Sequence, residues 1–292
     1  MPKVTVILPN YNHQDYIEER IESILNQDFR DFELIILDDA SIDKSPENIR
    51  KFLTDSRIIE FVINDQNSGS TFIQWEKGLQ KAQGEYIWIA ESDDIADKRF
   101  LSELITILDN DPKVGIAFCP SVWIDDKGNK ILEPEHESEE DFWQGNQLIQ
   151  NEFLAGNLIY NASSAVFRKE LIKKVNFSQI RQFKYTGDWL FWVQLISDVQ
   201  VKRIGKRLNF FRRHPNNVSF KSERDGLQFI EGIKIALNIF KNYPISWTKK
   251  RKTMLFWTKK LFLSENVDKE AVLQKMPFEV KTYFAFFKLF GK

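Results

Sequence analysis

Short, wholly apolar runs alternate with helical stripes over the first 125 residues, and this alternation constrains the fold more than any other feature of the sequence. The runs are rich in β-branched residues, as in strands that are buried on both faces. The predicted strands are Val4–Leu8, Phe32–Leu37, Ile58–Ile63, Tyr86–Ala90 and Val114–Ile124. Between them, apolar residues recur at helical spacing, for example at Ile17, Ile21 and Ile24. Strands that alternate with helices indicate βαβ crossovers, and the predicted fold class is therefore α/β with a mostly parallel sheet flanked by helices.

The second half of the sequence continues with shorter elements. A turn signal at Asp125–Gly128 separates two strand-like pieces, and an acidic loop over residues 133–141 follows. From Gly226 onward the pattern is helical and amphipathic. The other predicted elements are helices over 145–153 and 188–196 and strands over 165–167, 200–204 and 208–211.

The charge is uneven along the chain and supports a boundary near residue 222. Lys and Arg number 41 against 42 Asp and Glu overall, whereas residues 241–292 hold 12 basic and 4 acidic residues. We predict an α/β domain over residues 1–222 and a helical C-terminal region over 223–292, with the domain divided into halves at 1–125 and 126–222. An acidic main domain argues against nucleic-acid binding, and the basic end leaves contact with a membrane surface open.

Composition excludes several other classes of protein. Cys119 is the single cysteine, so an internal disulfide is excluded. One cysteine and three histidines in the whole sequence also make a structural zinc site a poor interpretation. No apolar run approaches the ~18 residues of a membrane-spanning helix, and no secretory signal pattern is present. We expect a soluble, cytoplasmic protein.

Polar residues follow three of the first four predicted strands. They are Pro9-Asn10-Tyr11-Asn12, Asp38-Asp39 and Glu91-Ser92-Asp93-Asp94. The carboxyl ends of parallel strands meet at one edge of a sheet, where ligands bind in folds of this class. Two acidic pairs at one edge repel each other unless a cation or ligand donors offset the charge, and hard oxygen ligands favour Mg²⁺ or Mn²⁺. Because Mg²⁺ usually shares substrate phosphates, the pattern predicts a nucleotide or phosphorylated ligand.

Each acidic pair also has a purely structural interpretation. Asp38 or Asp39 could cap the turn after its strand, and Asp93-Asp94 could begin the next helix. Other nucleotide motifs are missing, since the sequence has no phosphate-binding G-x-x-x-x-G-K-[ST] loop and no dinucleotide fingerprint. A nucleophile elbow of the form G-x-S-x-G is missing as well.

Several ordered segments resemble the family 2 glycosyltransferases, which are inverting enzymes with the GT-A fold. The similarity covers roughly residues 3–220. The matching segments are 4–12 (VTVILPNYN), 21–27 (IESILNQ), 32–41, 84–94 (with ESDD in the place of the metal-binding D-x-D), 185–189 (YTGDW) and 211–219 (FRRHPNNVS).

The resemblance implies roles for residues in the first half of the chain. Asp39 would accept a hydrogen bond from the uracil ring, as an acceptor-only carboxylate can. Asp93 would bind the metal that bridges the donor diphosphate, with Glu91 as a second candidate ligand. The nucleotide-binding residues implied in this way are Pro9, Tyr11, Asn12, Asp38, Asp39 and Asp93.

The resemblance also implies roles in the second half. Asp188 would be the general base for the acceptor hydroxyl, although an Asp in front of an apolar run is equally typical of a helix N-cap. Trp189 is a candidate stacking wall for a sugar. Arg212, Arg213 and His214 would contact the diphosphate or the metal.

Two departures from the family pattern stand close to these residues. Glu91 replaces the first Asp of D-x-D, and Ile73-Gln74-Trp75 replaces a frequent Ala-Arg-Asn segment. They motivate one alternative, a non-catalytic sugar-nucleotide-binding protein, and a metal-dependent nucleotidyltransferase is another. The predicted function is metal-dependent, inverting transfer from a nucleotide-sugar, with UDP as the expected nucleotide, to a hydroxyl of a saccharide or lipid-linked acceptor in surface polysaccharide synthesis. The basic C-terminal region has two interpretations: contact with an anionic membrane, which would place the enzyme peripherally at its inner face, or a helix packed on the main domain with its lysines in solvent.

Overall fold

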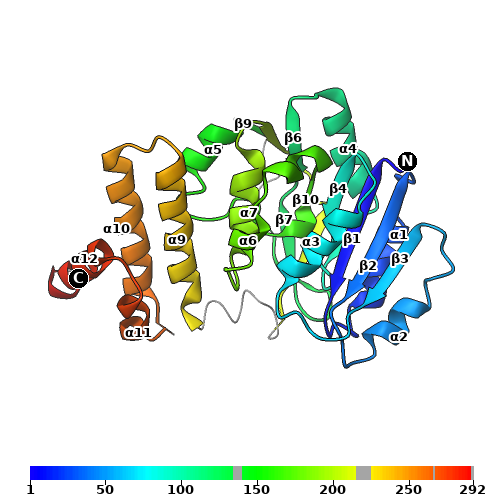
Figure 1. Ribbon diagram of the computed structural model, residues 1–292, viewed down its shortest axis with the longest axis horizontal. Helices are drawn as coiled ribbons and strands as arrows, with labels where there is room; N and C mark the ends of the chain where they lie inside the picture. Colours follow the sequence, from blue (N-terminus) through cyan, green and yellow to red (C-terminus); the bar gives the residue numbers. More distant parts are fainter. Residues whose placement is uncertain (134–139, 215–224, 266, 291–292) are drawn as a thin grey trace.

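The computed structural model describes residues 1–133, 140–214, 225–265 and 267–290, and its largest element is an eight-stranded sheet (Figure 1). The strands are β1 (Val4–Asn10), β2 (Phe32–Asp38), β3 (Ile58–Ile63), β4 (Tyr86–Ile89), β6 (Val114–Phe118), β9 (Asp141–Gln144), β10 (Ala165–Arg168) and β11 (Gln200–Arg203). Their order is β3-β2-β1-β4-β10-β6-β11-β9. The first four pair in parallel, β10 is antiparallel to β4 and β6, and β11 is parallel to β6 and antiparallel to β9. The predicted mostly parallel α/β sheet is confirmed.

Helices cover both faces of this sheet because apolar side chains point alternately to either side of each strand. In β1, Val6 and Leu8 enter one core and Ile7 enters the other. The first core is closed by α1 (Ile17–Leu25), α2 (Ser45–Arg50) and α4 (Phe100–Asn110). The second core is closed by α3 (Thr71–Lys81), α5 (Gly145–Asn151), α6 (Phe177–Ile180) and α7 (Gly187–Ile196).

In a smaller sheet, the last strand of the α/β region pairs with a short strand that directly follows the loop after β4. The sheet consists of β5 (Ile95–Ala96), β12 (Asn209–Arg212), β7 (Ser121–Ile124) and β8 (Lys130–Leu132), in that order. The prediction of one strand over 114–124 is wrong, because β6 stays in the large sheet while β7 joins the small one. Pro120 lies between them, and a proline cannot donate a hydrogen bond to a strand ladder.

The acidic loop predicted over 133–141 overlaps the start of a strand. Asp141 opens β9, which pairs with β11 from Gln144↔Gln200 to Asp141↔Arg203. Residues 134–139 of the predicted loop lie outside the described residues. Phe142 and Trp143 are the apolar residues of this strand, and the surrounding acidic residues concealed them in the sequence pattern.

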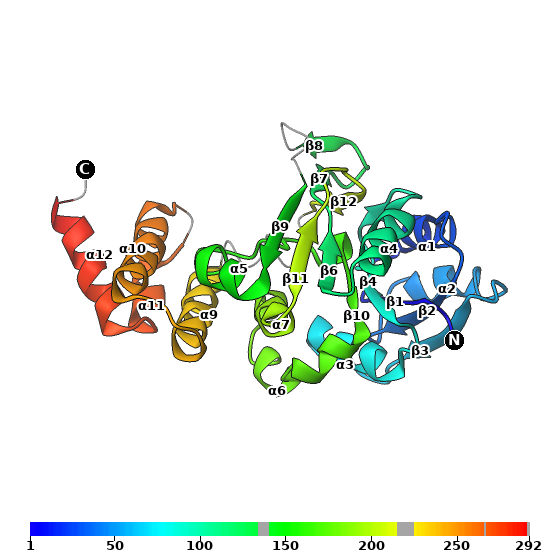
Figure 2. The same ribbon diagram turned by 90° about the horizontal axis from the view of Figure 1, so that it is seen from above.

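The described part of the C-terminal region consists of the helices α9 (Leu227–Asn242), α10 (Trp247–Leu263), α11 (Lys269–Gln274) and α12 (Phe278–Phe290). They lie at the end of the molecule opposite β3, in the order α9, α10, α12 away from the sheet (Figures 1 and 2). Their apolar side chains belong to the same core as α3 and α7. Trp257 of α10 lies against Trp189 of α7, with ring centroids 5.9 Å apart. No helix in the described part of the chain has the length and apolar character that crossing a membrane requires.

Candidate active site

The loops that follow β1 and β2 are fastened to each other by side-chain hydrogen bonds. Asn10 Nδ2 donates to Asp38 Oδ2 at 2.6 Å, and the Asn12 amide donates to Ser41 Oγ at 2.9 Å. Asp38 Oδ1 also accepts from the Ser41 amide at 2.8 Å. Asp38 therefore closes the turn after its strand, which is the structural interpretation that the sequence left open. Asn12 and Ala40 have φ angles of 55° and 60°, and a left-handed conformation at such residues is typical of strained functional loops.

Asp39 lies at the bottom of a ring of hydrogen-bond donors. Its carboxylate accepts from Asn64 Nδ2 at 2.6 Å, from the Ser68 amide and hydroxyl, and from Gln74 Nε2 at 2.8 Å. The side chain is 4% exposed. Gln74 Oε1 is buried beside it and has no hydrogen-bond partner within the residues that the structure covers. This is a buried acceptor that a ligand's N–H group could satisfy.

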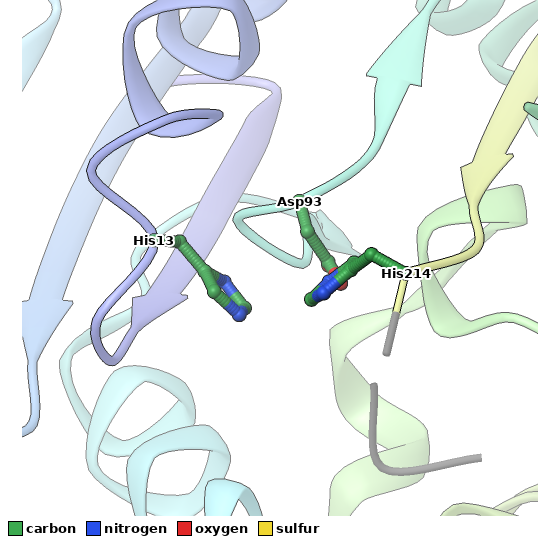
Figure 3. A group of neighbouring side chains, drawn as sticks. All are labelled: His13, Asp93 and His214. Carbon is green, nitrogen blue, oxygen red and sulfur yellow. The ribbon is translucent and has the colours of Figure 1, made fainter. Parts of the chain in front are cut away.

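Three side chains from distant parts of the chain meet beyond β4: His13, Asp93 and His214 (Figure 3). His214 Nε2 lies 3.1 Å from Asp93 Oδ2, and His13 Nδ1 lies 2.7 Å from Ser92 Oγ. One ligand atom of each residue lies within 4.8 Å of the others. Burial would raise the pKa of Asp93, but His13 and His214 lower it below its usual range by charge and hydrogen bonding. The group is one carboxylate and two imidazoles, a donor set that suits a divalent cation.

The small sheet explains why His214 reaches Asp93. Antiparallel pairing of β12 with β5 sets Asn209 against Ala96, so the chain after β12 runs past Asp94 and Asp93. Arg212 consolidates this approach, since its amide donates to Asp94 Oδ1 at 3.1 Å and its Nε to the Asp93 carbonyl at 2.9 Å. Its Nη2 donates to Glu19 at 2.6 Å. Arg212 is 2% exposed and holds the acidic loop that follows β4, residues 91–94. Its predicted contact with the diphosphate stays a prediction.

The acidic residues beside Asp93, of which Asp94 is buried and Glu91 is partly buried, have raised pKa values. Burial, together with the charge of Asp93, raises the pKa of Glu91 to about 8 and that of Asp94 to about 6. Glu91 accepts a hydrogen bond from Trp75 Nε1 at 2.8 Å, and Asp94 accepts one from Asn161 at 2.9 Å. The Glu91 carboxyl is thus hydrogen-bonded to Trp75, and Glu91 does not belong to the group formed by His13, Asp93 and His214. Arg20 of α1, fully buried over the ring of Trp88, supplies a positive charge behind these carboxylates.

Asp188 is the second residue of α7, and Thr186 occupies the N-cap position, so the N-cap interpretation of Asp188 is wrong. Asn157 Nδ2 donates to Asp188 Oδ2 at 2.8 Å. Burial raises the pKa of Asp188 to about 7, although hydrogen bonds from backbone amides and from Asn157 act against this rise. A carboxylate with a pKa near neutrality is suited to accept a proton in general-base catalysis.

Helix α3 contacts all three parts of the candidate site. Gln74 donates to Asp39, and Trp75 donates to Glu91 of the acidic loop. Gly187 packs on the ring of Phe72, where an added Cβ would lie only 2.5 Å from a ring carbon. The segment in which the sequence departs from the family pattern therefore links the two carboxylate loops, and Phe72 just before it contacts the residue before Asp188.

The remaining predicted residues lie in varied surroundings. Tyr11 is 44% exposed, and Pro9 is buried in β1 opposite Leu37. Arg213 lies over the Trp123 ring at 4.9 Å. Trp189 is 3% exposed and packs against Trp257, so its predicted role as a sugar-stacking wall is wrong. Its position next to Asp188 in the sequence could not show whether the Trp189 ring is buried or exposed.

Some residues of the site were not predicted. His13 directly follows the Pro9–Asn12 segment, and extending the strand-end argument by one residue would have included it. Asn157 and Asn161 carry no sequence signal, because a single amide side chain has no spacing pattern, whereas Gln74 stood out only within the segment that departs from the family pattern.

A parallel-sheet edge that gathers carboxylates and imidazoles defines an α/β protein with a candidate ligand- and cation-binding site at the strand ends. The model of glycosyl transferase family 2 matches residues 5–175, more than half of the chain, and the chain belongs to this family. It is a glycosyltransferase.

Curated and solved relatives agree with this assignment. An uncharacterized glycosyltransferase of Haemophilus influenzae is 30% identical over 207 residues, covering 68% of this chain and 74% of the relative. The GalNAc(5)-diNAcBac-PP-undecaprenol β-1,3-glucosyltransferase of Campylobacter jejuni is 28% identical over 203 residues, covering 68% of this chain and 61% of the relative. The crystal structure of S. aureus TarS 1–349 in complex with UDP has the same fold, with a TM-score of 0.63 at 19% identity over 96% of this chain and 77% of that one.

Proposed function

We propose that this glycosyltransferase transfers a sugar from a UDP-sugar, with inversion, to a hydroxyl of a saccharide or lipid-linked acceptor in surface polysaccharide synthesis. Residues 1–125 bind the donor and residues 126–222 form the acceptor side. The observation that carries the proposal is the joining of Asp93 to His13 and His214 at the sheet edge that also bears Asp39. The UDP complex of TarS and the lipid-linked substrate in the name of the C. jejuni relative support the donor and acceptor classes.

The base of the nucleotide is read by Asp39 and Gln74. The Asp39 carboxylate and the buried, unpartnered Gln74 Oε1 are both acceptors, so they select a base edge that donates an N–H. Uracil presents its N3–H in this way. Asn12 and Asp38 hold the surrounding loops in place, and the exposed ring of Tyr11 and the end of β1 at Pro9 line the pocket.

A divalent cation fits the group formed by His13, Asp93 and His214. Two imidazoles and one carboxylate suit Mn²⁺ better than Mg²⁺, which prefers oxygen ligands. When bound, the ion stabilises the charge that develops on the leaving diphosphate. Ser92 orients the His13 ring through Nδ1, which leaves Nε2 as the ligand atom. Arg212 fixes the backbone at Asp93. Arg213 brings positive charge to the diphosphate, and His214 supplies a ligand atom for the metal.

Asp188 accepts the proton of the acceptor hydroxyl. In an inverting transfer the nucleophile attacks from the face opposite the diphosphate, so the base must be separate from the metal ligands. Asp188 satisfies this requirement, because it lies in α7 and accepts a hydrogen bond from Asn157, away from the loop 91–94 that contains Asp93.

A peripheral contact with an anionic membrane brings the enzyme to a lipid-linked acceptor. In α10, Arg251, Lys252 and Lys259 are exposed, and Trp247 is 71% exposed. Basic residues attract an anionic surface and exposed aromatic rings enter its headgroup region. Charge reversal in the double variant Arg251→Glu, Lys252→Glu should reduce co-sedimentation with phosphatidylglycerol vesicles, and unchanged co-sedimentation would exclude this contact. Point substitutions are required because truncation at residue 246 would remove Trp257 from the core.

The test of the main proposal is product analysis with a panel of UDP-, GDP- and dTDP-sugars and Mn²⁺. Release of UDP from one UDP-sugar, lost in Asp93→Asn, supports the proposal. Release of pyrophosphate would indicate a nucleotidyltransferase instead, and binding without turnover would indicate a non-catalytic protein.

A further inference from the structure

A buried carboxylate from the C-terminal region binds the segment that precedes Asp188. Glu231 lies in α9, is 5% exposed, and is surrounded along the helix by Ile230, Gly232 and Ile233. Its Oε1 accepts from the Lys184 amide at 2.7 Å, and its Oε2 accepts from the Tyr185 and Thr186 amides at 3.0 Å each. The Thr186 hydroxyl donates to Oε2 as well, at 3.1 Å. Three consecutive backbone N–H groups therefore converge on one carboxylate.

These hydrogen bonds fix the segment that leads into α7, up to its N-cap residue Thr186. Without Glu231, three buried N–H groups would lose their acceptor. A carboxylate at this end also interacts favourably with the helix dipole. The segment 184–186 leads directly into Gly187 and Asp188, so the position of α9 sets where the Asp188 carboxyl lies.

We propose that Glu231 is a positioning residue for Asp188 and that the C-terminal helices act on the transfer reaction through it. The inference rests on the proposed role of Asp188 as the base. Glu231 does not touch the reacting groups; it fixes the backbone that carries the base.

The packing around Glu231 makes its position rigid. Gly232 faces the Trp257 ring, where an added Cβ would lie 2.5 Å from the indole. Trp257 Nε1 donates to the Leu154 carbonyl at 3.0 Å, and its ring lies against Trp189, the neighbour of Asp188. The contacts of α9 and α10 thus reach the first turn of α7 from two sides.

Glu231 also contributes negative charge near the base. Its charge adds to burial in raising the pKa of Asp188. Charged groups on the other elements around α7 are engaged elsewhere: Glu76 of α3 pairs with Arg181 at 3.2 Å, Lys174 pairs with Asp198 at 3.1 Å, and Lys260 lies over the Trp257 ring at 5.2 Å. Within the binding segment itself, Lys184 and Tyr185 contact Asp225.

The experiment compares Glu231→Gln and Glu231→Ala with a matched control, Asp225→Asn. Asp225 contacts the side chain of Tyr185 in the same segment but none of its amides, at 2.8 Å from the Tyr185 hydroxyl. Hydrogen exchange of the amides of residues 184–186 should accelerate about tenfold or more in both Glu231 variants and remain unchanged in the control. This measurement needs no turnover, so it decides whether Glu231 holds the segment even if the proposed function fails.

The catalytic consequence is measured as UDP release from UDP-glucose and UDP-GlcNAc with Mn²⁺ over a range of pH. Glu231→Gln keeps the shape and removes the charge, so the acidic limb of the pH–rate profile should move to lower pH. Glu231→Ala should lower kcat about tenfold with the Kd of UDP unchanged, because only the base is displaced. A Glu231→Ala protein that unfolds leaves Glu231→Gln as the deciding variant. Unchanged amide exchange, or a lower rate with an unshifted profile in Glu231→Gln, would overturn the proposal.

Discussion

Asp188→Asn separates the catalytic role of the carboxyl from any role in stability. Asparagine keeps the size of the side chain, and its Oδ1 can still accept the hydrogen bond from Asn157. It has no basicity, so the rate of sugar transfer should fall by about 10²-fold or more while the affinity for UDP stays the same. In the wild-type enzyme the rate should decline as the pH falls through about 7, because the base is then protonated.

The same substitution should stabilise the fold at alkaline pH. The pKa of Asp188 rises from 3.8 to about 7 on folding, so the folded state binds the proton more tightly than the unfolded state. The resulting stabilisation is complete below pH 4 and is lost as the pH rises through about 7. Above that pH the ionised carboxyl lowers the free energy of unfolding by at most about 4 kcal/mol, and solvent screening at this partly exposed group reduces the effect to about 1–2 kcal/mol.

Thermal unfolding at two pH values tests this sign. Asp188→Asn should raise Tm by a few degrees at pH 8.5 and by less than half as much at pH 5, because the wild-type carboxyl has regained most of its protonation-linked stability there. Transfer near the wild-type rate would show that the base lies elsewhere. A variant that is less stable at pH 8.5 than at pH 5, relative to the wild type, would refute the account of the buried carboxyl.

Three further outcomes follow from the contacts described above. His13→Ala should weaken Mn²⁺ binding in the presence of UDP about tenfold or more, as measured by calorimetry. Ser92→Ala should weaken Mn²⁺ binding less, because it only frees the His13 ring. Equal Mn²⁺ affinity in His13→Ala and the wild type would show that His13 is not a ligand. Asp39→Ala should weaken uridine itself without metal, whereas His13→Ala should not, and calorimetry with uridine in EDTA distinguishes the two. Trp257→Ala removes a ring that is 3% exposed and should lower the free energy of unfolding by about 3–5 kcal/mol in urea titrations, whereas a loss below about 1 kcal/mol would show that α10 is not part of the core.

The sheet and its strand-end polar residues could be predicted from sequence because buried parallel strands are continuous apolar runs. The split of 114–124 was missed, since the apolar pattern continues across Pro120 although the two pieces join different sheets. The resemblance named Asp93 and His214, but their contact depends on the pairing of β12 with β5, a two-residue strand without a periodic pattern.

Buried polar residues outside the strand ends were harder to predict. Glu231 is an acidic residue in an apolar helix, and its sequence surroundings do not show which amides it binds. Trp189 was misassigned for a related reason, because its partner Trp257 lies in a helix that the pattern treated as a separate region. In both cases the decisive contact joins segments more than 40 residues apart.

The shared core of α7, α9 and α10 limits how this enzyme can exchange parts with its relatives. A graft of the C-terminal helices from a homologue would need a cut where the α/β region ends. Here such a cut would fall between Trp189 and Trp257 and between the amides of 184–186 and the carboxylate of Glu231. A working chimera would have to carry residues 184–196 together with α9 and α10, and these segments should therefore be inherited as one unit.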